Sequence, residues 1–413
     1  MSTGAFFKFP MMIRRLHAGP LSVHIEAYVA LLQDQGYARQ SARVHLQVLA
    51  DFSRWLQRRE LGVGDIDAST LQRYLRCRSR FVDRHRGASS ALDKLLGMLR
   101  DRGIANHVAA PVAIDPVERA KEDFKRYLLQ ERGLSASIVL VYLPVVHQFL
   151  RERFGRGPIR LSELRATDLT GFVQRHVYEH SPRTAQHMVA ALRSFLRHLR
   201  LRGEITTDLA ACVPTVANWS YSTLPKFLQP GQVQQVLARC ERHTSVGRRN
   251  YAILLLLARL GLRAGEVVAM TLDDIDWKEG RLTVRGKGGQ WADMPLPATV
   301  GKAIAAYLQL GRPRCASRRL FIREHAPRLG IANSSTISTL VKRALAQAGV
   351  ESAHTGAHVF RHSLATEMLQ HGASLGEIGQ LLRHQRPDTT QIYAKVDLSA
   401  LRQLALPWPG DGQ

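Results

Sequence analysis

Apolar residues recur at helical spacing through the N-terminal half of the chain. From about Leu21 to Arg86, apolar stripes alternate with basic positions and are interrupted at Gly36. A looser stretch, residues 105–117, precedes a second helical unit that runs to about Pro214. Its segment HMVAALRSFLRHLRLRG has an apolar stripe with arginines opposite. This spacing predicts amphipathic helices in both units.

The two units match each other along the sequence. The run Leu31–Gln33 followed by Gly36 corresponds to Leu128–Gln130 followed by Gly133, and further apolar positions continue at the same offset. We therefore predict a tandem pair of small helical domains. Any two amphipathic bundles could align this well, and that alternative stays open.

In the C-terminal half the hydrophobic pattern changes from helical to strand-like spacing and then back to helical spacing. A near-continuous apolar helix ends at Gly261, and residues 274–297 then alternate as in strands, with a glycine-rich turn at residues 286–289. Further helical segments follow. The pattern predicts a mainly α fold with a small antiparallel β-sheet, in three domains at residues 1–105, 115–215 and 225–413. The polar segment Val213–Phe227 is expected to link the last two.

Composition narrows the class of protein. The 413 residues include 58 Lys and Arg against 34 Asp and Glu, a net charge of +24, which favours a polyanionic partner. The basic residues are spread along the chain, and the longest apolar run, residues 252–258, is too short to span a membrane. The N-terminus lacks a signal-peptide pattern. The 4 cysteines form no paired motif, which indicates a reducing cytosol and no structural zinc.

The segment from His354 to Lys395 carries the candidate chemistry. His358 and Arg361 stand three apart, so a helix presents both from one face. A second helix is expected to end near His384, because Pro387 restricts the residue before it, and a last short helix carries Tyr393. A turn there lets His384 and Tyr393 converge. Basic side chains, a donor histidine and a nucleophilic phenol suit phosphoryl transfer.

A further arginine follows the long apolar helix. Arg263 lies between two buried segments, where a charge is costly unless paired, and Glu266 is its expected partner. A purely structural ion pair is an equal alternative on these residues alone.

These motifs together resemble the tyrosine recombinases, the phage integrase family. The residues that carry the likeness are His358-x-x-Arg361-His362, Leu382-Arg383-His384, Tyr393 and the segment LGLRAGEV around Arg263. One departure is Arg383, where the family commonly has glycine, which puts the local backbone geometry in doubt. His362 and His371 are interpreted as core or surface residues.

The resemblance implies roles for the remaining residues. Tyr393 would attack a DNA phosphodiester, Arg263 and Arg361 would bind the scissile phosphate, and Glu266 would orient Arg263. His384 would donate to the same phosphate, and His358 would position the site and handle the tyrosine proton. Lys287, at the hairpin tip, would protonate the leaving 5′ oxygen. No metal or cofactor is implied.

The same resemblance implies a catalytic domain at residues 225–413 behind tandem helical DNA-binding domains. Residues 115–215 would bind the core site, and the SAM-like module at residues 1–105 would bind arm sites or make a second core contact. Double-stranded DNA and a tetrameric synaptic complex, formed alone or with sister recombinases, are the expected partners. A helix from Asp397 would dock on the neighbouring protomer.

The expected function is site-specific recombination of a mobile element, in the bacterial cytosol or nucleoid. Two rivals stay open. One is a type IB topoisomerase or resolvase-like activity that uses the same site. The other is an architectural or regulatory DNA-binding protein whose catalytic site has decayed, although the set of six catalytic residues argues against it.

Overall fold

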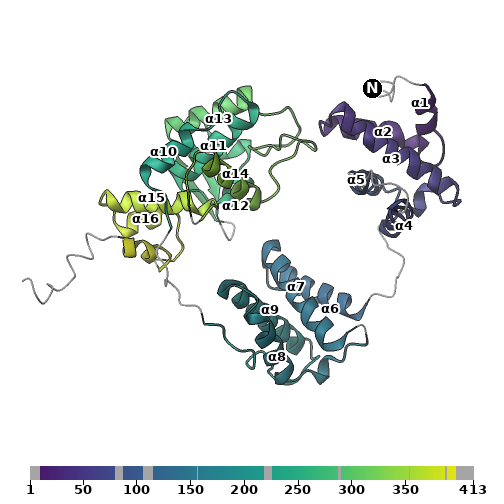
Figure 1. The fold of residues 1–413 in the computed structure, drawn as a ribbon, viewed down its shortest axis with the longest axis horizontal. Coiled ribbons are helices and arrows are strands. Elements are labelled where there is room, and N and C mark those ends of the chain that lie inside the picture. The colour runs from purple at the N-terminus through teal and green to yellow at the C-terminus, as the bar shows by residue number, and fades with distance from the viewer. Residues whose placement is uncertain are drawn as a thin grey trace, which may run out of the picture. The chain divides into compact units, whose positions relative to one another are not determined.

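The computed structural model describes residues 10–79, 87–105, 115–155, 157–217, 226–286, 290–352, 354–386 and 388–396. Over these ranges the chain is mostly helical, and its strands form one small sheet (Figure 1). The predicted mainly α fold with a small antiparallel sheet is confirmed. The chain divides into two compact units, Met1–His107 with Thr223–Gln413, and Val108–Ser222. The division into three domains stays a prediction. Among the described helices, none has the length and apolar character to cross a membrane.

The first helical region packs its helices around a core of its own. Along α3 (Arg39–Gln57) the buried residues Ala42, Leu46, Leu49, Phe52 and Leu56 recur every three or four positions, which places them on one face. Around this face pack the remaining helices of the region, α1 (Pro10–Leu16), α2 (Ile25–Asp34), α4 (Ala68–Ser79) and α5 (Ala88–Asp101).

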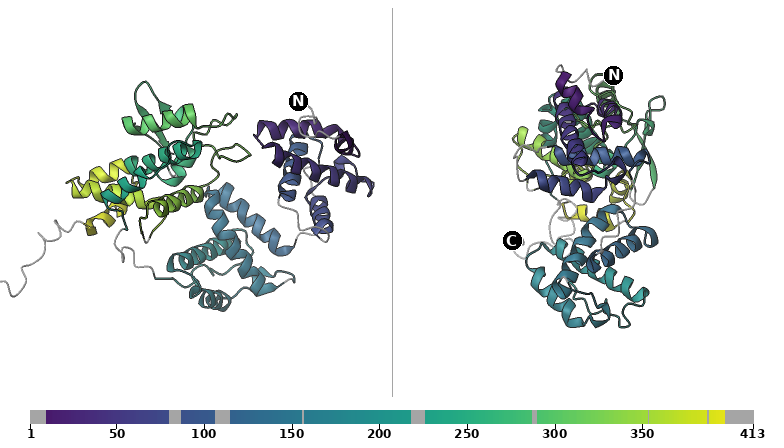
Figure 2. Two further views of the ribbon diagram at one scale, coloured as in Figure 1. Left: turned by 45° about the horizontal axis from the view of Figure 1, so that its top comes forward. Right: turned by 90° about the vertical axis from the view of Figure 1, so that its right-hand side faces the viewer.

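The second helical region also has a separate core. Its longest helix, α9 (Pro182–Leu201), begins where the Ser181 side chain accepts a hydrogen bond from the Thr184 N–H, with proline in the first turn. The neighbouring helices lie alongside it in each view of the ribbon (Figures 1 and 2). They are α6 (Pro116–Arg126), which continues into a π-helical turn at Tyr127–Glu131, α7 (Ala136–Phe154) and α8 (Ala166–Val177).

The two helical regions repeat the same order of elements. Both α3 and α7 are 19 residues long, and each follows a glycine with positive φ, Gly36 or Gly133. A short 3-10 turn comes next in each region, and then α4 and α8 at 12 residues each. The predicted tandem arrangement is therefore present at the level of secondary structure.

The C-terminal region places its helices around a three-stranded antiparallel sheet in the order β1-β2-β3. Leu282 on β2 pairs with Met294 on β3, and both are buried, as the alternation predicted. The strands are β1 (Ile275–Asp276), β2 (Arg281–Arg285) and β3 (Trp291–Pro295). The helices are α10 (Pro230–Ala238), α11 (Ser245–Leu260), α12 (Ala264–Ala269), α13 (Ala298–Leu310), α14 (Ser334–Gln347), α15 (His358–Gln370), α16 (Leu375–Leu381) and α17 (Asp388–Gln391), which runs into a 3-10 turn at Ile392–Val396.

The core of this region explains where the candidate residues lie. The predicted apolar helix is α11, which is buried along most of its length and contributes to the main core. A smaller cluster joins Ala365 of α15, Ile378 of α16, Leu382 and Tyr393. This cluster holds α15, the end of α16 and the turn with Tyr393 together. Three parts of the sequence-based predictions lie outside the described residues: the hairpin tip with Lys287, Pro387 and the helix from Asp397.

Candidate active site

The turn after α11 shapes one wall of the site. Gly261 caps the helix with φ +58°, a left-handed conformation that glycine adopts readily. A Cβ atom there would meet Leu382 Cδ2 at 2.7 Å and Leu364 Cδ2 at 3.1 Å. The missing side chain therefore allows the turn to pack against α15 and the end of α16.

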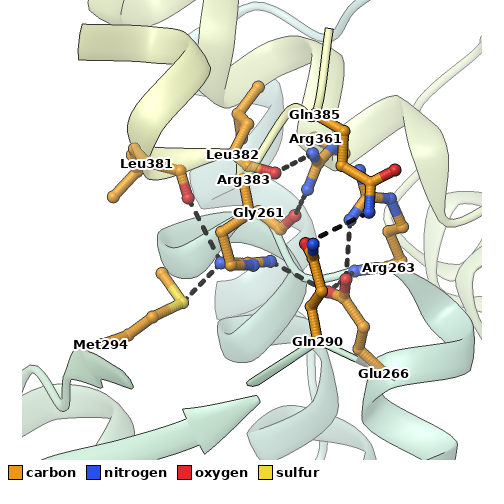
Figure 3. A network of polar contacts seen from close by, with 10 residues as sticks. All are labelled: Gly261, Arg263, Glu266, Gln290, Met294, Arg361, Leu381, Leu382, Arg383 and Gln385. Atoms are coloured by element: carbon orange, nitrogen blue, oxygen red, sulfur yellow. Dashed lines mark hydrogen bonds and ion pairs between the residues drawn. The ribbon is translucent and has the colours of Figure 1, made fainter. Parts of the chain in front are cut away.

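Arg263 begins the next helix. Its backbone N–H donates to Glu266 Oε2 at 2.8 Å, as in a helix N-cap, and its guanidinium donates to Glu266 Oε1 at 2.7 Å (Figure 3). The Glu266 side chain is 4% exposed and that of Arg263 is 31% exposed. The expected Arg263–Glu266 pair is therefore present, with the carboxylate inside and the guanidinium reaching the surface.

Arg361 on α15 is a buried cation. Its guanidinium donates to the backbone carbonyls of Gly261 and Leu382, which brings α15 against the turn after α11 and the end of α16 (Figure 3). Burial lowers its pKa to about 10, and the positive charges of Arg263 and Arg383 act in the same direction. An arginine that stays charged under such conditions is well suited to neutralise an anion.

His384 follows α16 in a tight turn. The backbone N–H of His384 donates to the carbonyl of Gly379 at 2.9 Å, and the backbone N–H of Arg383 donates to the carbonyl of Gln380 at 3.0 Å. This bond pattern is the Schellman helix end, which requires a left-handed residue at position 383. Arg383 has φ +55° and meets that requirement without glycine. The departure from the family pattern therefore leaves the turn geometry in place.

The His384 ring lies next to the segment that carries Tyr393. Its Nδ1 atom is 2.7 Å from the Thr390 hydroxyl oxygen. Burial lowers the His384 pKa to about 4, with further lowering by Arg361, Arg263 and Arg383. At neutral pH the ring is therefore uncharged, so its two nitrogens have different roles, one as donor and one as acceptor.

Tyr393 lies in the 3-10 turn after α17 and is 1% exposed. Its hydroxyl is 3.0 Å from Nδ1 of His362. Burial raises the Tyr393 pKa to about 12, while the charges of Arg361 and Arg263 act to lower it. The positive charges of both arginines therefore act on the phenol of Tyr393.

His362 was interpreted from the sequence as a core or surface histidine, and the structure shows a half-buried ring in contact with Tyr393. Burial lowers its pKa to about 4, with smaller contributions from His358, Arg361 and His354. The neutral ring can accept a hydrogen bond from the Tyr393 hydroxyl. His371 does lie on the surface, next to the carbonyl of Glu367, as expected.

The structure brings Arg263, Glu266, Arg361, His384 and Tyr393 together. His358 begins α15 and is exposed. Lys287 lies outside the described residues, so its expected role stays a prediction. Within the described part of the chain, no group of three or more His, Cys, Asp or Glu side chains could hold a metal ion.

Three further residues contact the candidate site residues although sequence analysis assigned no role to them. They are His362, Thr390 and Arg383, which contacts Glu266 at 2.9 Å. His362 and Arg383 stand beside signature residues, which was a usable signal. Nothing in the sequence pointed to Thr390.

Comparison with known proteins agrees with this geometry. The phage integrase family matches residues 226–399. The putative integrase/recombinase y4rA of Sinorhizobium fredii (strain NBRC 101917 / NGR234) is 46% identical over 413 residues, which cover 99% of each chain. Tyrosine recombinase XerD of Listeria monocytogenes serovar 1/2a is 30% identical over 290 residues, which cover 68% of this chain and 96% of XerD.

A solved structure shares the fold of this chain. The XerH site-specific recombinase bound to its palindromic difH substrate superposes with a TM-score of 0.55 at 19% identity. The match covers 71% of this chain and 97% of XerH. At this identity the match shows a shared fold. With full-length relatives, a matching family domain and the predicted signature in one site, the chain belongs to the phage integrase family, the tyrosine recombinases of site-specific DNA recombination.

Proposed function

We propose that this protein is a site-specific recombinase that cuts and rejoins DNA through a 3′-phosphotyrosyl intermediate, for integration, excision or transposition of a mobile element. One observation carries the proposal: the Tyr393 hydroxyl lies 3.0 Å from Nδ1 of His362, and its ring packs with Leu382, whose carbonyl accepts a hydrogen bond from Arg361. A nucleophile beside fixed positive charge is what attack on a phosphodiester requires.

The cleavage step forms one bond and breaks one. The Tyr393 Oη atom attacks the scissile phosphorus, and the bond from phosphorus to the 5′ oxygen breaks. Arg263 and Arg361 neutralise the non-bridging oxygens. The leaving 5′ oxygen takes a proton, in the proposed mechanism from Lys287. The products are a 3′-phosphotyrosine and a free 5′-hydroxyl, and attack by another 5′-hydroxyl reverses the step. The covalent link conserves the phosphodiester energy, so no ATP is needed.

His384 acts as a neutral donor in this mechanism. If the Thr390 hydroxyl donates to Nδ1 at 2.7 Å, the ring proton resides on Nε2. That N–H can donate to a non-bridging phosphate oxygen although the imidazole carries no charge. Thr390 then determines which tautomer is present.

The proton of Tyr393 has two candidate acceptors. His358 is the one implied by the family resemblance, and it remains part of the proposal as a positioning group. His362 is the one whose ring nitrogen lies 3.0 Å from the hydroxyl. A neutral imidazole within hydrogen-bond distance is suited to accept the proton as the phenol attacks.

Three guanidinium groups surround the site, those of Arg263, Arg361 and Arg383. They supply the charge stabilisation that a divalent cation gives in other phosphoryl transferases, so we propose that cleavage is independent of metal. The net charge of +24 and the tandem helical regions fit double-stranded DNA as substrate. Four protomers on two paired sites would complete the strand exchange.

The test is covalent capture on a nicked duplex. A binding duplex is first selected from a random-sequence library with the full chain, and nicked versions then trap the intermediate, because the short 5′ fragment diffuses away. The wild type should form a covalent protein–DNA band in EDTA, and Tyr393→Phe should bind but form none. Tight binding by the wild type with no covalent band at any nick position would overturn the proposal in favour of an architectural role. Relaxation of supercoiled plasmid with no strand exchange would favour a topoisomerase.

A further inference from the structure

Arg383 is the residue at which this chain departs from its family, and its backbone is under strain. It occupies the left-handed position of the Schellman turn after α16, with φ +55°. For a residue with a Cβ atom this conformation is unfavourable. Such a conformation persists where surrounding contacts hold it. The contacts of the side chain should therefore explain why arginine is present.

The Arg383 side chain lies across the middle of the site. It is 13% exposed, and its Nη2 atom donates to Glu266 Oε2 at 2.9 Å. Its Nη1 atom reaches the carbonyl of Leu381 at 3.2 Å and contacts the sulfur of Met294 on β3 (Figure 3). One guanidinium thus connects the end of α16 to α12 and to the sheet.

The contact changes how Glu266 holds Arg263. Oε1 accepts from the Arg263 guanidinium, whereas Oε2 accepts from the Arg263 backbone N–H and from Arg383. An isolated arginine–carboxylate pair favours a fork of two parallel bonds to both oxygens. Because Oε2 already accepts from the Arg263 backbone N–H and from Arg383, the Arg263 side chain is held through a single Nη1 contact. Its other side-chain donors remain available to a phosphate.

The charge balance and the exposure of the three arginines agree with an inner Arg383 and an outer Arg263. The three guanidiniums and the one carboxylate leave two positive charges uncompensated. Exposure differs among the arginines: the side chain of Arg263 is 31% exposed, that of Arg383 is 13% exposed, and Arg361 is 4% exposed as a whole residue. Arg263 is the cation of the pair that faces outward, and Arg383 is the one that stays inside with Glu266.

We propose that Arg383 is a positioning residue for DNA cleavage. It holds one oxygen of Glu266, which leaves the outer donors of Arg263 to the scissile phosphate, and it fixes the turn that presents His384. The inference rests on the proposed function. In this chain an inner arginine replaces the usual glycine and links the two sides of the phosphate site.

The experiment compares Arg383→Gly with Arg383→Lys on the selected nicked duplex. Glycine restores the residue that the turn prefers, so it removes the side chain without backbone strain. We expect Arg383→Gly to lower the single-turnover cleavage rate at saturating DNA by about tenfold or more, the scale of a lost charge-assisted contact. The DNA concentration that gives half the maximal rate should change little. Arg383→Lys, which can still reach Glu266 Oε2, should recover most of the rate.

A double-mutant cycle with Glu266→Gln separates positioning from plain structural support. If Arg383 acts through Glu266, Arg383→Gly should have little further effect in the Glu266→Gln background. A purely structural role would lower the melting temperature and the rate together, and lysine would not rescue the rate.

The outcomes distinguish failure of this inference from failure of the proposed function. Wild-type cleavage with an unchanged Arg383→Gly rate would overturn the inference and leave the proposed function standing. The same would follow from an Arg383→Gly effect that is equally large in the Glu266→Gln background. Wild type that binds the duplex and never forms the covalent band would overturn the proposed function, and the inference with it.

Discussion

The candidate active site has two halves that are held by different interactions. The arginine half, Arg263, Glu266, Arg361 and Arg383, is held by ion pairs and by bonds from guanidinium groups to backbone carbonyls. The tyrosine half, His362, His384, Thr390 and Tyr393, is held by hydrogen bonds between groups that are uncharged at neutral pH. One half carries fixed charge, and the other carries protons that can move.

The charges of the arginine half shift the pKa values of groups in the tyrosine half. Arg361 contributes to the lowered pKa of both His362 and His384, and it opposes the raised pKa of Tyr393. Burial keeps the imidazoles neutral and the fixed positive charge acts in the same direction, whereas for the phenol that charge offsets part of the effect of burial. In the proposed mechanism, the tyrosine half exchanges protons while the charge of the arginine half stays constant.

Within the arginine half, we expect Arg361→Lys to cause the largest loss of cleavage rate. Lysine keeps the charge but replaces a planar fork, which reaches two carbonyls, with a point charge. We expect single-turnover cleavage to fall by about 100-fold to 1,000-fold, while the DNA still binds. Covalent-complex formation on the selected nicked duplex measures the rate. A rate within about tenfold of wild type would show that charge alone is sufficient here.

The tyrosine half is tested next by His362→Asn. Asparagine can accept the Tyr393 hydrogen bond but cannot take up its proton, so the cleavage rate should fall by about 100-fold. The matched control is His358→Asn, which changes the exposed histidine one turn earlier on α15. A larger loss from His358→Asn than from His362→Asn would transfer the acceptor role to His358.

The role proposed for His362 also predicts how the cleavage rate depends on pH. A base acts in its neutral form, above its pKa, and the pKa of His362 is lowered to about 4. The wild-type rate should therefore show no acid limb near the ordinary histidine pKa of 6.5 and should decline only as the pH approaches about 4. A rate–pH profile with a midpoint near 6.5 would contradict a buried neutral base.

Thr390→Val should have a smaller effect. Valine keeps the shape of the side chain and removes the hydroxyl that fixes the His384 tautomer. Both tautomers then become populated, and the rate should fall about fivefold to tenfold, as expected for one neutral hydrogen bond. Thr390→Ser is the control and should retain the wild-type rate. Equal losses in the serine and valine variants would point to packing of the methyl group instead.

A separate effect is expected on stability in acid. The pKa values of His362 and His384 are about 4 in the folded protein, against 6.5 ordinarily. Between these values the unfolded chain binds more protons, so the free energy of unfolding rises with pH. The contribution of both groups is complete above about pH 6.5 and is lost as the pH falls towards 4. Thermal unfolding across this range should show a shallower decline for His362→Asn than for wild type.

Much of the fold follows from local sequence. Apolar periodicity predicted the helical regions, Gly261 was expected to end α11, and the alternation of Leu282 and Val284 predicted β2. The Arg263–Glu266 pair was also predictable, because its members are three residues apart. In each case the interaction that decides the structure lies within a few residues of the signal.

The rest of the site depends on contacts between distant positions. Arg383 and Glu266 are 117 residues apart, and His362 and Tyr393 are 31 apart. Helical spacing places His362 next to Arg361, but it does not indicate that a separate short helix brings Tyr393 onto that face. Only packing of α15, α16 and the last turns decides which histidine meets the phenol.

The tandem helical regions have a consequence for how such a recombinase can evolve. One core is made of residues between Leu16 and Ala105, and the other of residues between Val117 and Val213. Mutations at separated sites act nearly additively, so repacking one core leaves the other intact. A lineage can therefore accumulate changes in one copy while the second copy and the chemistry behind Tyr393 remain as they were.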